Sequence, residues 1–515
     1  MRASIVKRVA LGLTASITAV TVAAVALGNP APRVLGGDLR KAAGAREAIT
    51  VLDLPAAKKI LEGADPGDAA LAVERARYDL FGGDYDGAAT LLSRPELSAT
   101  REGAELGDIA RGCARGMAAT IEAHDDEGWV TVLLQDDEDR ALVPLITATA
   151  IKVRAQLVKD LGVELPKPLR VDLVRDQFTL AAMTGLPEKA AQTTGTVAVA
   201  KWGRVTMISP RAMSHGYPWL DTLAHEMTHL ALSRGTKDMA PLWLQEGVAK
   251  REETRWREPQ PLDDVPSVDS VAQSGIDKGL GRSLDKLGPS IAMLPTAEEA
   301  AVAYAEVSSF IRYWSKEVGD EGLPRLVLQL ATIKNQDEVD AAIKEVSGLD
   351  LAGWDKKWRA HLATQPKNLS ADLAPGAPMP HQMEISKKVR LSQLLMGRKH
   401  NDVAASELAR AQQLAPTDGA IRCWFAAARV AEGDRANAAP LVEKIEDVHS
   451  PFGRWWSMHG LLHPEPPEAA DKAFSLAIAL DPMTPEVACE EKVAPELPKD
   501  PLRAAICEAA RRVPR

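Results

Sequence analysis

The feature that most constrains this chain is the segment DTLAHEMTHLALSRG, residues 221–235, in which His225 and His229 stand four positions apart. Leu, Ala and Met occupy many of the remaining positions, which favours a packed helix. Residues i and i+4 lie one above the other on a helix, so both imidazoles face the same way. Glu226 lies about 100° round the helix from His225. The segment is therefore either a metal site of the H-E-x-x-H kind or the polar side of an ordinary amphipathic helix.

Composition narrows the class of protein that carries this segment. A chain of 515 residues is long enough for about three domains, and its 46% hydrophobic and 26% charged residues are typical of a globular protein. Aromatic residues make up only 4% while alanine is abundant, so helix is favoured over sheet. The formal net charge of −9 argues against nucleic acid as the main partner, because no basic surplus is present to neutralise phosphates.

The amino terminus indicates where the protein acts. A basic start, MRASIVKR, precedes an uncharged run over residues 9–28, so residues 1–28 are predicted to be a secretory signal peptide or an N-terminal membrane anchor. We therefore expect an extracytoplasmic protein, which is periplasmic, secreted or membrane-anchored and facing outside. Cys489 and Cys507 flank a Pro-rich segment and could form a disulfide there, whereas Cys113 and Cys423 are expected to be small buried hydrophobes.

The middle of the chain reads as an α+β unit over residues 125–260, with a small sheet placed before the motif helix. Four strands are predicted in it, and two of them are joined by a Trp202-Gly203 turn that suits a hairpin; their ranges are 129–135, 169–174, 196–201 and 204–209. The motif helix is expected to begin near Pro218 and to stop at Gly235. The polar stretch 263–288 is either a mobile flap or a plain connector, and the connector is favoured slightly.

Helical regions flank this unit on both sides. Residues 29–120 contain short helix pairs of the kind found in tetratricopeptide (TPR) repeats. Residues 366–385 are Pro-rich and are predicted to be a linker. Over 386–515, three similar units begin near positions 388, 420 and 454, and a spacing of about 34 residues is that of TPR helix pairs. These repeats predict a protein partner.

A catalytic zinc ion normally has three protein ligands and a water, so a third ligand is needed. The segment PLWLQEGVAK, residues 241–250, supplies a candidate in Glu246. Pro241 can begin a second helix, and a helical hairpin can return this carboxylate to the two imidazoles. Trp243 and Leu244 give Glu246 an apolar neighbourhood, where an unpaired charge would be costly and metal coordination would remove that cost.

The two segments together, HEMTH at 225–229 and WLQEGVA at 243–249, resemble the gluzincin metallopeptidases and above all the peptidase MA-like domains of bacterial envelope proteins. The resemblance covers residues 125–365 and implies a zincin-like α+β fold. It implies Zn²⁺ bound by His225, His229 and Glu246, with Glu226 as the general base.

Related gluzincins also carry a tyrosine that stabilises the oxyanion, downstream of the glutamate ligand. In the segment VAYAEVSSFIRYW, residues 302–314, Tyr304 stands at the matching position and Tyr313 is the rival.

Some features depart from that family. The Gly-x-Met-Glu-Asn segment of gluzincin aminopeptidases is absent upstream of the motif, and Lys250 and Arg251 stand where an aromatic residue is common. These differences leave zinc binding intact and put aminopeptidase specificity in doubt. The strand RVTMIS, residues 204–209, is expected to be an edge strand that holds an extended peptide. Asp221 is expected to cap or stabilise the start of the motif helix.

The histidines outside the motif are a weaker source of candidates. His215 is a candidate for lining the cleft because it lies just before the motif helix. The others are expected to be solvated; they are His124, His361, His381, His400, His449, His459 and His463.

The sequence thus favours a zinc-dependent metallopeptidase that hydrolyses peptide bonds with a zinc-activated water. Two alternatives stay open. One is a TPR-type binding scaffold with a catalytically inactive peptidase-like domain, and the intact set of four site residues argues against it. The other is a zinc hydrolase that acts on amides other than peptides.

Overall fold

The computed structural model describes residues 37–210, 217–259, 263–264, 267–365, 382–414, 416, 419–443 and 453–480. The predicted signal or anchor segment, His215, the linker up to residue 381, and Cys489 and Cys507 lie outside this part of the chain. None of the helices among the described residues is long and apolar enough to cross a membrane.

A mixed five-stranded sheet lies at the centre of the fold, in the order β1-β2-β3-β5-β4. β2 and β5 run parallel to β3, whereas β1 and β4 are antiparallel strands at the two edges. The strands are β1 (Ile121–His124), β2 (Val130–Leu134), β3 (Leu169–Val174), β4 (Ala198–Lys201) and β5 (Arg204–Ile208). All four predicted strands are therefore present, and β1 is an additional strand that begins before the expected boundary at residue 125.

The β4–β5 hairpin turns at Trp202 and Gly203, as predicted. Both residues have positive φ angles, 58° and 71°, which is the conformation of a two-residue turn with the twist of the flanking strands. The expectation that residues 204–209 form an edge strand is wrong. β5 lies inside the sheet between β3 and β4, and β4 is the edge strand.

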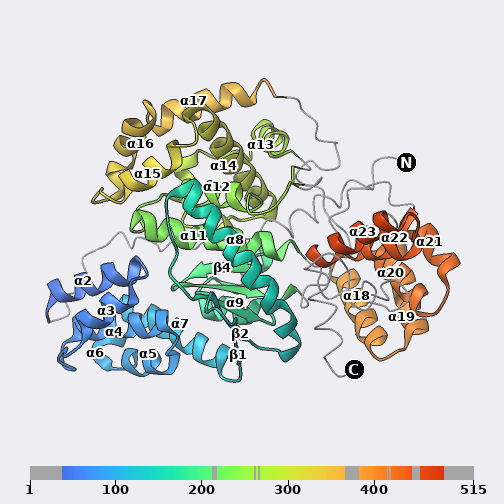
Figure 1. The fold of residues 1–515 in the computed structure, drawn as a ribbon, viewed down its shortest axis with the longest axis horizontal. Coiled ribbons are helices and arrows are strands. Elements are labelled where there is room, and N and C mark those ends of the chain that lie inside the picture. Colours follow the sequence, from blue (N-terminus) through green and yellow to red (C-terminus); the bar gives the residue numbers. More distant parts are fainter. Residues whose placement is uncertain are drawn as a thin grey trace.

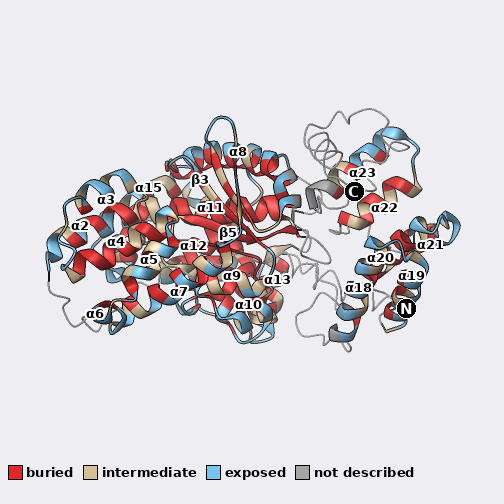
Figure 2. Cartoon of the chain, turned by 90° about the horizontal axis from the view of Figure 1, so that it is seen from below, coloured by how far each residue is buried: buried red, intermediate tan, exposed pale blue. Residues whose placement is uncertain are grey.

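Helices cover both faces of the sheet (Figure 1). One face carries α8 (Val143–Leu161) and the motif helix α11 (Trp219–Thr236), which pack on apolar side chains of β2 to β5. The other face carries α9 (Gln177–Thr184) and, against it, α7 (Arg101–Met117). Figure 2 shows the buried residues concentrated in the sheet and in the helices around it.

The N-terminal region is a stack of short helices that ends in α7. Aspartates at positions 38, 53, 68 and 84 each accept a hydrogen bond from a backbone N–H in the first turn of the following helix, which explains where four of these helices begin. The helices before α7 are α2 (Leu39–Thr50), α3 (Leu54–Leu61), α4 (Ala69–Gly82), α5 (Tyr85–Leu92) and α6 (Pro95–Ser98).

A second helical layer covers α11 on the side away from the sheet. Its centre is α12 (Leu242–Glu252), packed against the 22-residue helix α14 (Ala297–Val318). The remaining elements of residues 137–362 are η2 (Asp137–Leu142), α10 (Glu188–Thr194), α13 (Val268–Asp277), η4 (Leu284–Lys286), η5 (Ile291–Met293), α15 (Gly322–Leu330), η6 (Gln336–Glu338), α16 (Val339–Ser347) and α17 (Leu351–Leu362). The stretch 263–288, predicted to be a flap or a connector, thus contains helix α13.

The C-terminal region consists of three consecutive helix pairs. They begin at residues 382, 419 and 453, close to the predicted unit starts, and their helices are α18 (Gln382–Gly397), α19 (Asn401–Leu414), α20 (Gly419–Ala431), α21 (Arg435–Glu443), α22 (Gly453–Leu462) and α23 (Pro467–Leu480). Helix α18 starts inside the range that was expected to be linker. The last helix, α23, lies against α11 (Figure 1).

Candidate metal centre

The α11–α12 hairpin brings together the three residues proposed as metal ligands. One ligand atom from each of His225, His229 and Glu246 lies within 4.8 Å of the other two. Glu246 Oε2 is 3.5 Å from His225 Nε2 and 3.7 Å from His229 Nε2. The first helix contributes two imidazoles at i and i+4, and the second returns a carboxylate to them.

These distances fit a zinc ion. Two atoms that each bind zinc at about 2.05 Å with a tetrahedral angle between them are about 3.4 Å apart. Both Nε2 atoms are buried and make no hydrogen bond among the described residues, which would be costly unless another group binds them. A metal ion between the two imidazoles and Glu246 would satisfy both nitrogens.

The other nitrogen of each imidazole has a partner. His225 Nδ1 lies 3.2 Å from Glu253 Oε2, and His229 Nδ1 lies 3.2 Å from Gln245 Oε1. Both partners accept hydrogen bonds, so each Nδ1 carries the proton and each Nε2 presents its lone pair. Lys250 Nζ lies 2.5 Å from the same Glu253 oxygen and balances its charge.

Glu226 is held with one oxygen occupied and the other available. Its Oε2 accepts a hydrogen bond of 2.5 Å from the backbone N–H of Ala200 in β4. Its Oε1 is buried and has no hydrogen-bond partner among the described residues. The carboxylate is therefore anchored at the edge of the sheet while one oxygen remains free to accept a proton.

Tyr304 lies beside these carboxylates. Burial raises the pKa of its hydroxyl, and electrostatic interactions with Glu246 and Glu226 raise it further. Its rival Tyr313 instead stacks on His361, with ring centroids 4.8 Å apart. A second tyrosine, Tyr217, also interacts with Glu226, and its hydroxyl donates to the carbonyl of Ile208.

The site is deeply buried. The exposed fraction of the side chains is 3% or less for each of the five residues, which are His225, Glu226, His229, Glu246 and Tyr304. Burial lowers the pKa of both histidines and raises the pKa of Glu226. The imidazoles are thus held neutral, which is the form that binds a metal ion.

Close packing between α12 and α14 holds Glu246 in place. At Gly247, an added Cβ would lie 2.4 Å from Ile311 Cγ1 and 2.7 Å from the carbonyl oxygen of Val307, so only glycine permits this approach. Next to it, Trp243 packs edge-to-face on Phe310 at a centroid distance of 5.4 Å. The apolar neighbourhood of Glu246 predicted from the sequence is therefore the α12–α14 contact.

Asp221 was expected to cap or stabilise the start of the motif helix; it lies in the first turn of α11 but does not cap it. The N-cap residue is Pro218, and no side chain caps this end. Asp221 instead forms a two-point ion pair with Arg257, at 2.8 and 2.6 Å, and accepts a hydrogen bond from the indole of Trp256. It thereby ties the start of α11 to the segment after α12.

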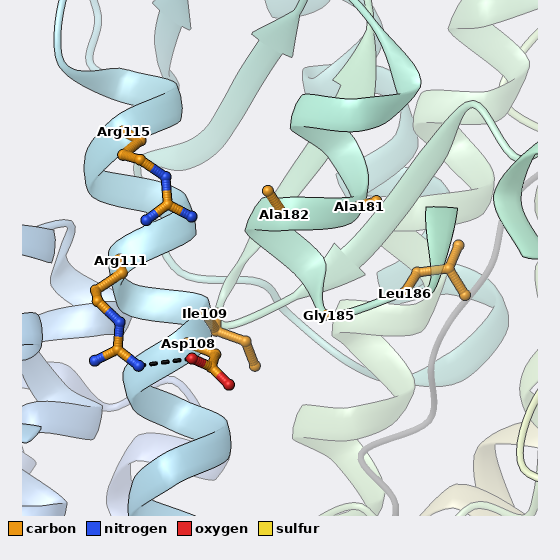
Figure 3. Close-up of a pocket in the computed structure, with 8 residues that line it drawn as sticks. All are labelled: Asp108, Ile109, Arg111, Arg115, Ala181, Ala182, Gly185 and Leu186. Atoms are coloured by element: carbon orange, nitrogen blue, oxygen red, sulfur yellow. Dashed lines mark hydrogen bonds and ion pairs between the residues drawn. The ribbon is translucent and has the colours of Figure 1, made fainter. Parts of the chain in front are cut away.

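A pocket elsewhere in the fold is separate from this centre. It lies between α7 and α9, on the opposite face of the sheet from α11, and Arg111 in its wall pairs with Asp108 at 2.6 Å (Figure 3). Its lining residues are Asp108, Ile109, Arg111, Arg115, Ala181, Ala182, Gly185 and Leu186.

Comparison with known proteins points to the same part of the chain. Residues 149–364 match the family model of the Peptidase MA superfamily. The match covers less than half of the chain, includes every residue of the centre, and supports a gluzincin-like peptidase domain there. This superfamily is typically metal-dependent, in agreement with the His-His-Glu cluster. No curated protein and no solved structure matches the chain.

Three contacts of the peptidase-like domain were not predicted from the sequence. They are the Glu253 and Gln245 contacts with the imidazoles and the Ala200 N–H bond to Glu226. Only the role of Glu253 had a signal in the sequence. It stands one helical turn after Lys250, so the two were a possible ion pair on one face of the helix.

Proposed function

We propose that this protein is a zinc-dependent metallopeptidase whose ligands are His225, His229 and Glu246. The observation that carries the proposal is the convergence of two buried, unpaired Nε2 atoms on the Glu246 carboxylate at 3.5 and 3.7 Å. The superfamily match over the same residues supports a peptidase rather than a purely structural metal site.

The roles of the remaining site residues follow from their positions. A zinc ion held there supplies Lewis acidity toward a scissile carbonyl and lowers the pKa of a bound water. Glu226, anchored through Oε2, is placed to accept a proton on Oε1 and to deliver it to the leaving amine. The Tyr304 hydroxyl, whose raised pKa keeps it protonated, is placed to donate to the developing oxyanion.

We propose that the substrate pairs with β4, the edge strand. The Ile208 N–H donates to the Val197 carbonyl at 2.7 Å, so residues 197, 199 and 201 turn their backbone groups toward β5. The backbone groups of Ala198 and Ala200 consequently point away from β5, toward the side of β4 that pairs with no strand among the described residues, and the Ala200 N–H reaches the catalytic base. A peptide added as a further strand would lie next to Glu226.

The helical regions and the amino terminus support two further parts of the proposal. Three consecutive helix pairs, α18 to α23, have a repeat length typical of TPR units, which bind protein partners. The basic start and the uncharged run over residues 9–28 support an extracytoplasmic location.

The experiment compares purified wild-type protein with Glu226→Gln. We expect zinc in both proteins and hydrolysis of casein or of a peptide library by the wild type alone. Equal hydrolysis by the variant would contradict the role of Glu226 as the base. Zinc without any proteolysis would favour the hydrolase of non-peptide amides, and absence of zinc would favour the inactive scaffold.

A further inference from the structure

We propose that the turn between α2 and α3 closes one end of the β4 edge, so that the enzyme cleaves only bonds within about three residues of one end of its substrate. The proposal rests on the proposed function and adds to it a substrate class, namely peptide chain ends rather than internal sites of long chains. We call this turn, residues 51–53, the stop. It belongs to the N-terminal helices and lies outside the segment that matches the peptidase superfamily.

The first contact of this turn is with the end of the edge strand. A Cβ added at Gly203 would lie 3.2 Å from Leu52 Cδ2 and 2.9 Å from Phe81 Cδ1. Beside Leu52, Phe81 of helix α4 packs edge-to-face on the indole of Trp202, with centroids 6.1 Å apart. A chain that pairs with Ala200 and continues past the hairpin therefore meets these two side chains.

The second contact is with the end of the motif helix. The Arg234 guanidinium of α11 donates to the carbonyl of Val51, and Lys237 pairs with Glu47 of α2 at 2.7 Å. Because Glu226 of α11 accepts a hydrogen bond from the outward-facing N–H of Ala200, the helix lies alongside the outer edge of β4. A turn that contacts both the end of β4 and the end of α11 crosses the path between them.

The distance from the catalytic base to this stop is similar along both elements. Eight helical residues from Glu226 to Arg234 span about 12 Å at 1.5 Å per residue. Three strand residues from Ala200 to Gly203 span about 10 Å at 3.3 Å per residue. Both estimates leave room for about three extended substrate residues on this side of the scissile bond.

The test uses metal-loaded, full-length protein and two series of internally quenched peptides built on one cleaved sequence. One series is lengthened from one to six residues on the amino side of the scissile bond, and the other on the carboxyl side. We expect kcat/KM to fall by about tenfold or more beyond roughly three residues in one series and to stay level in the other. Level values in both series would overturn the stop while leaving the peptidase in place.

A substitution in the α2–α3 turn tests whether this turn is what limits the length of the substrate. Leu52 has a φ of 58°, which glycine adopts without strain, so Leu52→Gly removes the side chain and suits the backbone. We expect faster cleavage of the long peptides of the restricted series and unchanged cleavage of the short ones. Leu39→Ala, at a side chain that is 52% exposed at the start of α2, is the matched control and should change neither. Unchanged cleavage of the long peptides by folded Leu52→Gly would contradict the assignment to this turn.

The wild-type series tests the length limit even if the variant does not fold. Failure of the proposed function gives a different result from failure of the stop. If metal-loaded protein cleaves no peptide of either series or of a library, the peptidase proposal is overturned, and the stop with it.

Discussion

The two imidazoles of the candidate metal centre have different hydrogen-bond partners. His225 donates to a carboxylate, Glu253, whereas His229 donates to the neutral amide of Gln245. A carboxylate partner makes an imidazole a stronger donor to a metal ion than an amide does. The charge of Glu253 is balanced by Lys250 from the same helix. We therefore expect Glu253 to be the outer residue on which metal affinity depends most.

Replacing Glu253 by Gln keeps its size and removes its charge. We expect zinc affinity to fall about 10- to 100-fold, because His225 loses the partner that fixes its orientation and raises its basicity. Competition with a chelator measures this without recourse to activity. Glu317→Gln, at an exposed position of α14, is the control. An affinity equal to that of the wild type would show that Glu253 does not support the site.

Tyr304 and Tyr313 provide a matched comparison on one helix. Tyr304→Phe removes only the hydroxyl proposed to stabilise the oxyanion, so we expect kcat to fall roughly 100- to 1,000-fold with zinc content unchanged. Tyr313→Phe should leave kcat unchanged, because that ring stacks on His361 away from the centre. Steady-state kinetics of the two variants decide between them, and equal effects would refute the assignment of Tyr304.

The residues that sequence reasoning identified are those whose chemistry is local. His225, Glu226 and His229 follow from helical periodicity alone, and Glu246 follows from an apolar context in the next helix. The Ala200 bond to Glu226 joins residues 26 positions apart and depends on which strand lies at the edge. Strand order is set by how the whole sheet assembles, so local alternation could not show that β4, and not β5, is the edge strand.

Among the elements, α8 and α12 meet through a buried charged cluster. Asp160 of α8 accepts from Arg255 and Arg251, at 2.5 and 3.1 Å, while Glu252 of α12 contacts Arg251. Burial raises the pKa of Asp160, but hydrogen bonds from Arg255 and its other neighbours outweigh this and lower it to about 2. Burial raises the pKa of Glu252 to about 8, and Asp160 contributes to the increase. Glu252 is thus protonated at neutral pH beside an ionised Asp160.

The raised pKa of Glu252 predicts the sign of a pH effect on stability. The unfolded chain releases this proton near pH 4.5, whereas the folded protein keeps it until about pH 8. The folded state therefore binds more protons between these values, and the contribution of Glu252 to the free energy of unfolding falls as the pH rises through this window. Glu252→Gln copies the protonated form and should remove this part of the pH dependence.

Urea unfolding of the wild type and of Glu252→Gln at several pH values from 4.5 to 8 measures the effect. We expect the stability difference between the two proteins to change in favour of the variant as the pH rises. A difference that is constant over this range would contradict the raised pKa. Asp160 does not interfere, because its contribution is lost only as the pH falls from 3.8 through about 2.

For the whole molecule, the N-terminal helices are part of the core that supports the metal centre. Asp172 of β3 and Arg204 of β5 form an ion pair at 2.7 Å with both side chains fully buried. Tyr85 of α5 donates to Asp172 at 3.3 Å, and Arg204 lies 3.0 Å from the Cys113 sulfur of α7. The cluster therefore joins two N-terminal helices, α5 and α7, to β3 and to β5, the strand of the hairpin that precedes the motif helix.

Removing one partner of this buried ion pair should lower the stability of the folded protein. We expect Asp172→Ala to lower the free energy of unfolding by about 3–5 kcal/mol, because Arg204 would remain charged without its carboxylate in the interior. Denaturant titration measures the loss. Asp137→Ala breaks an exposed pair with Arg140 and should cost less than about 1 kcal/mol. Equal effects of the two substitutions would show that the cluster contributes little to stability.

The sequence indicated the helical nature of the N-terminal region but not its attachment to the sheet. Residues 29–120 read as a separate repeat region, because amphipathic helix pairs give the same pattern whether they stack on each other or on a sheet. The strand β1 was missed because its four residues, IEAH, show only one buried apolar position. Cys113 and Cys423, by contrast, are buried as predicted, since a helical, Ala-rich context is a local property.

The most direct test of the central claim is the zinc content of the purified chain, measured by mass spectrometry of the metal and compared among variants. We expect about one zinc ion per wild-type chain and almost none in His225→Ala or Glu246→Ala. His459→Ala, on helix α22 of the C-terminal region, should retain the wild-type amount. Equal zinc in all four proteins, or none in the wild type, would contradict a metal centre formed by the α11–α12 hairpin.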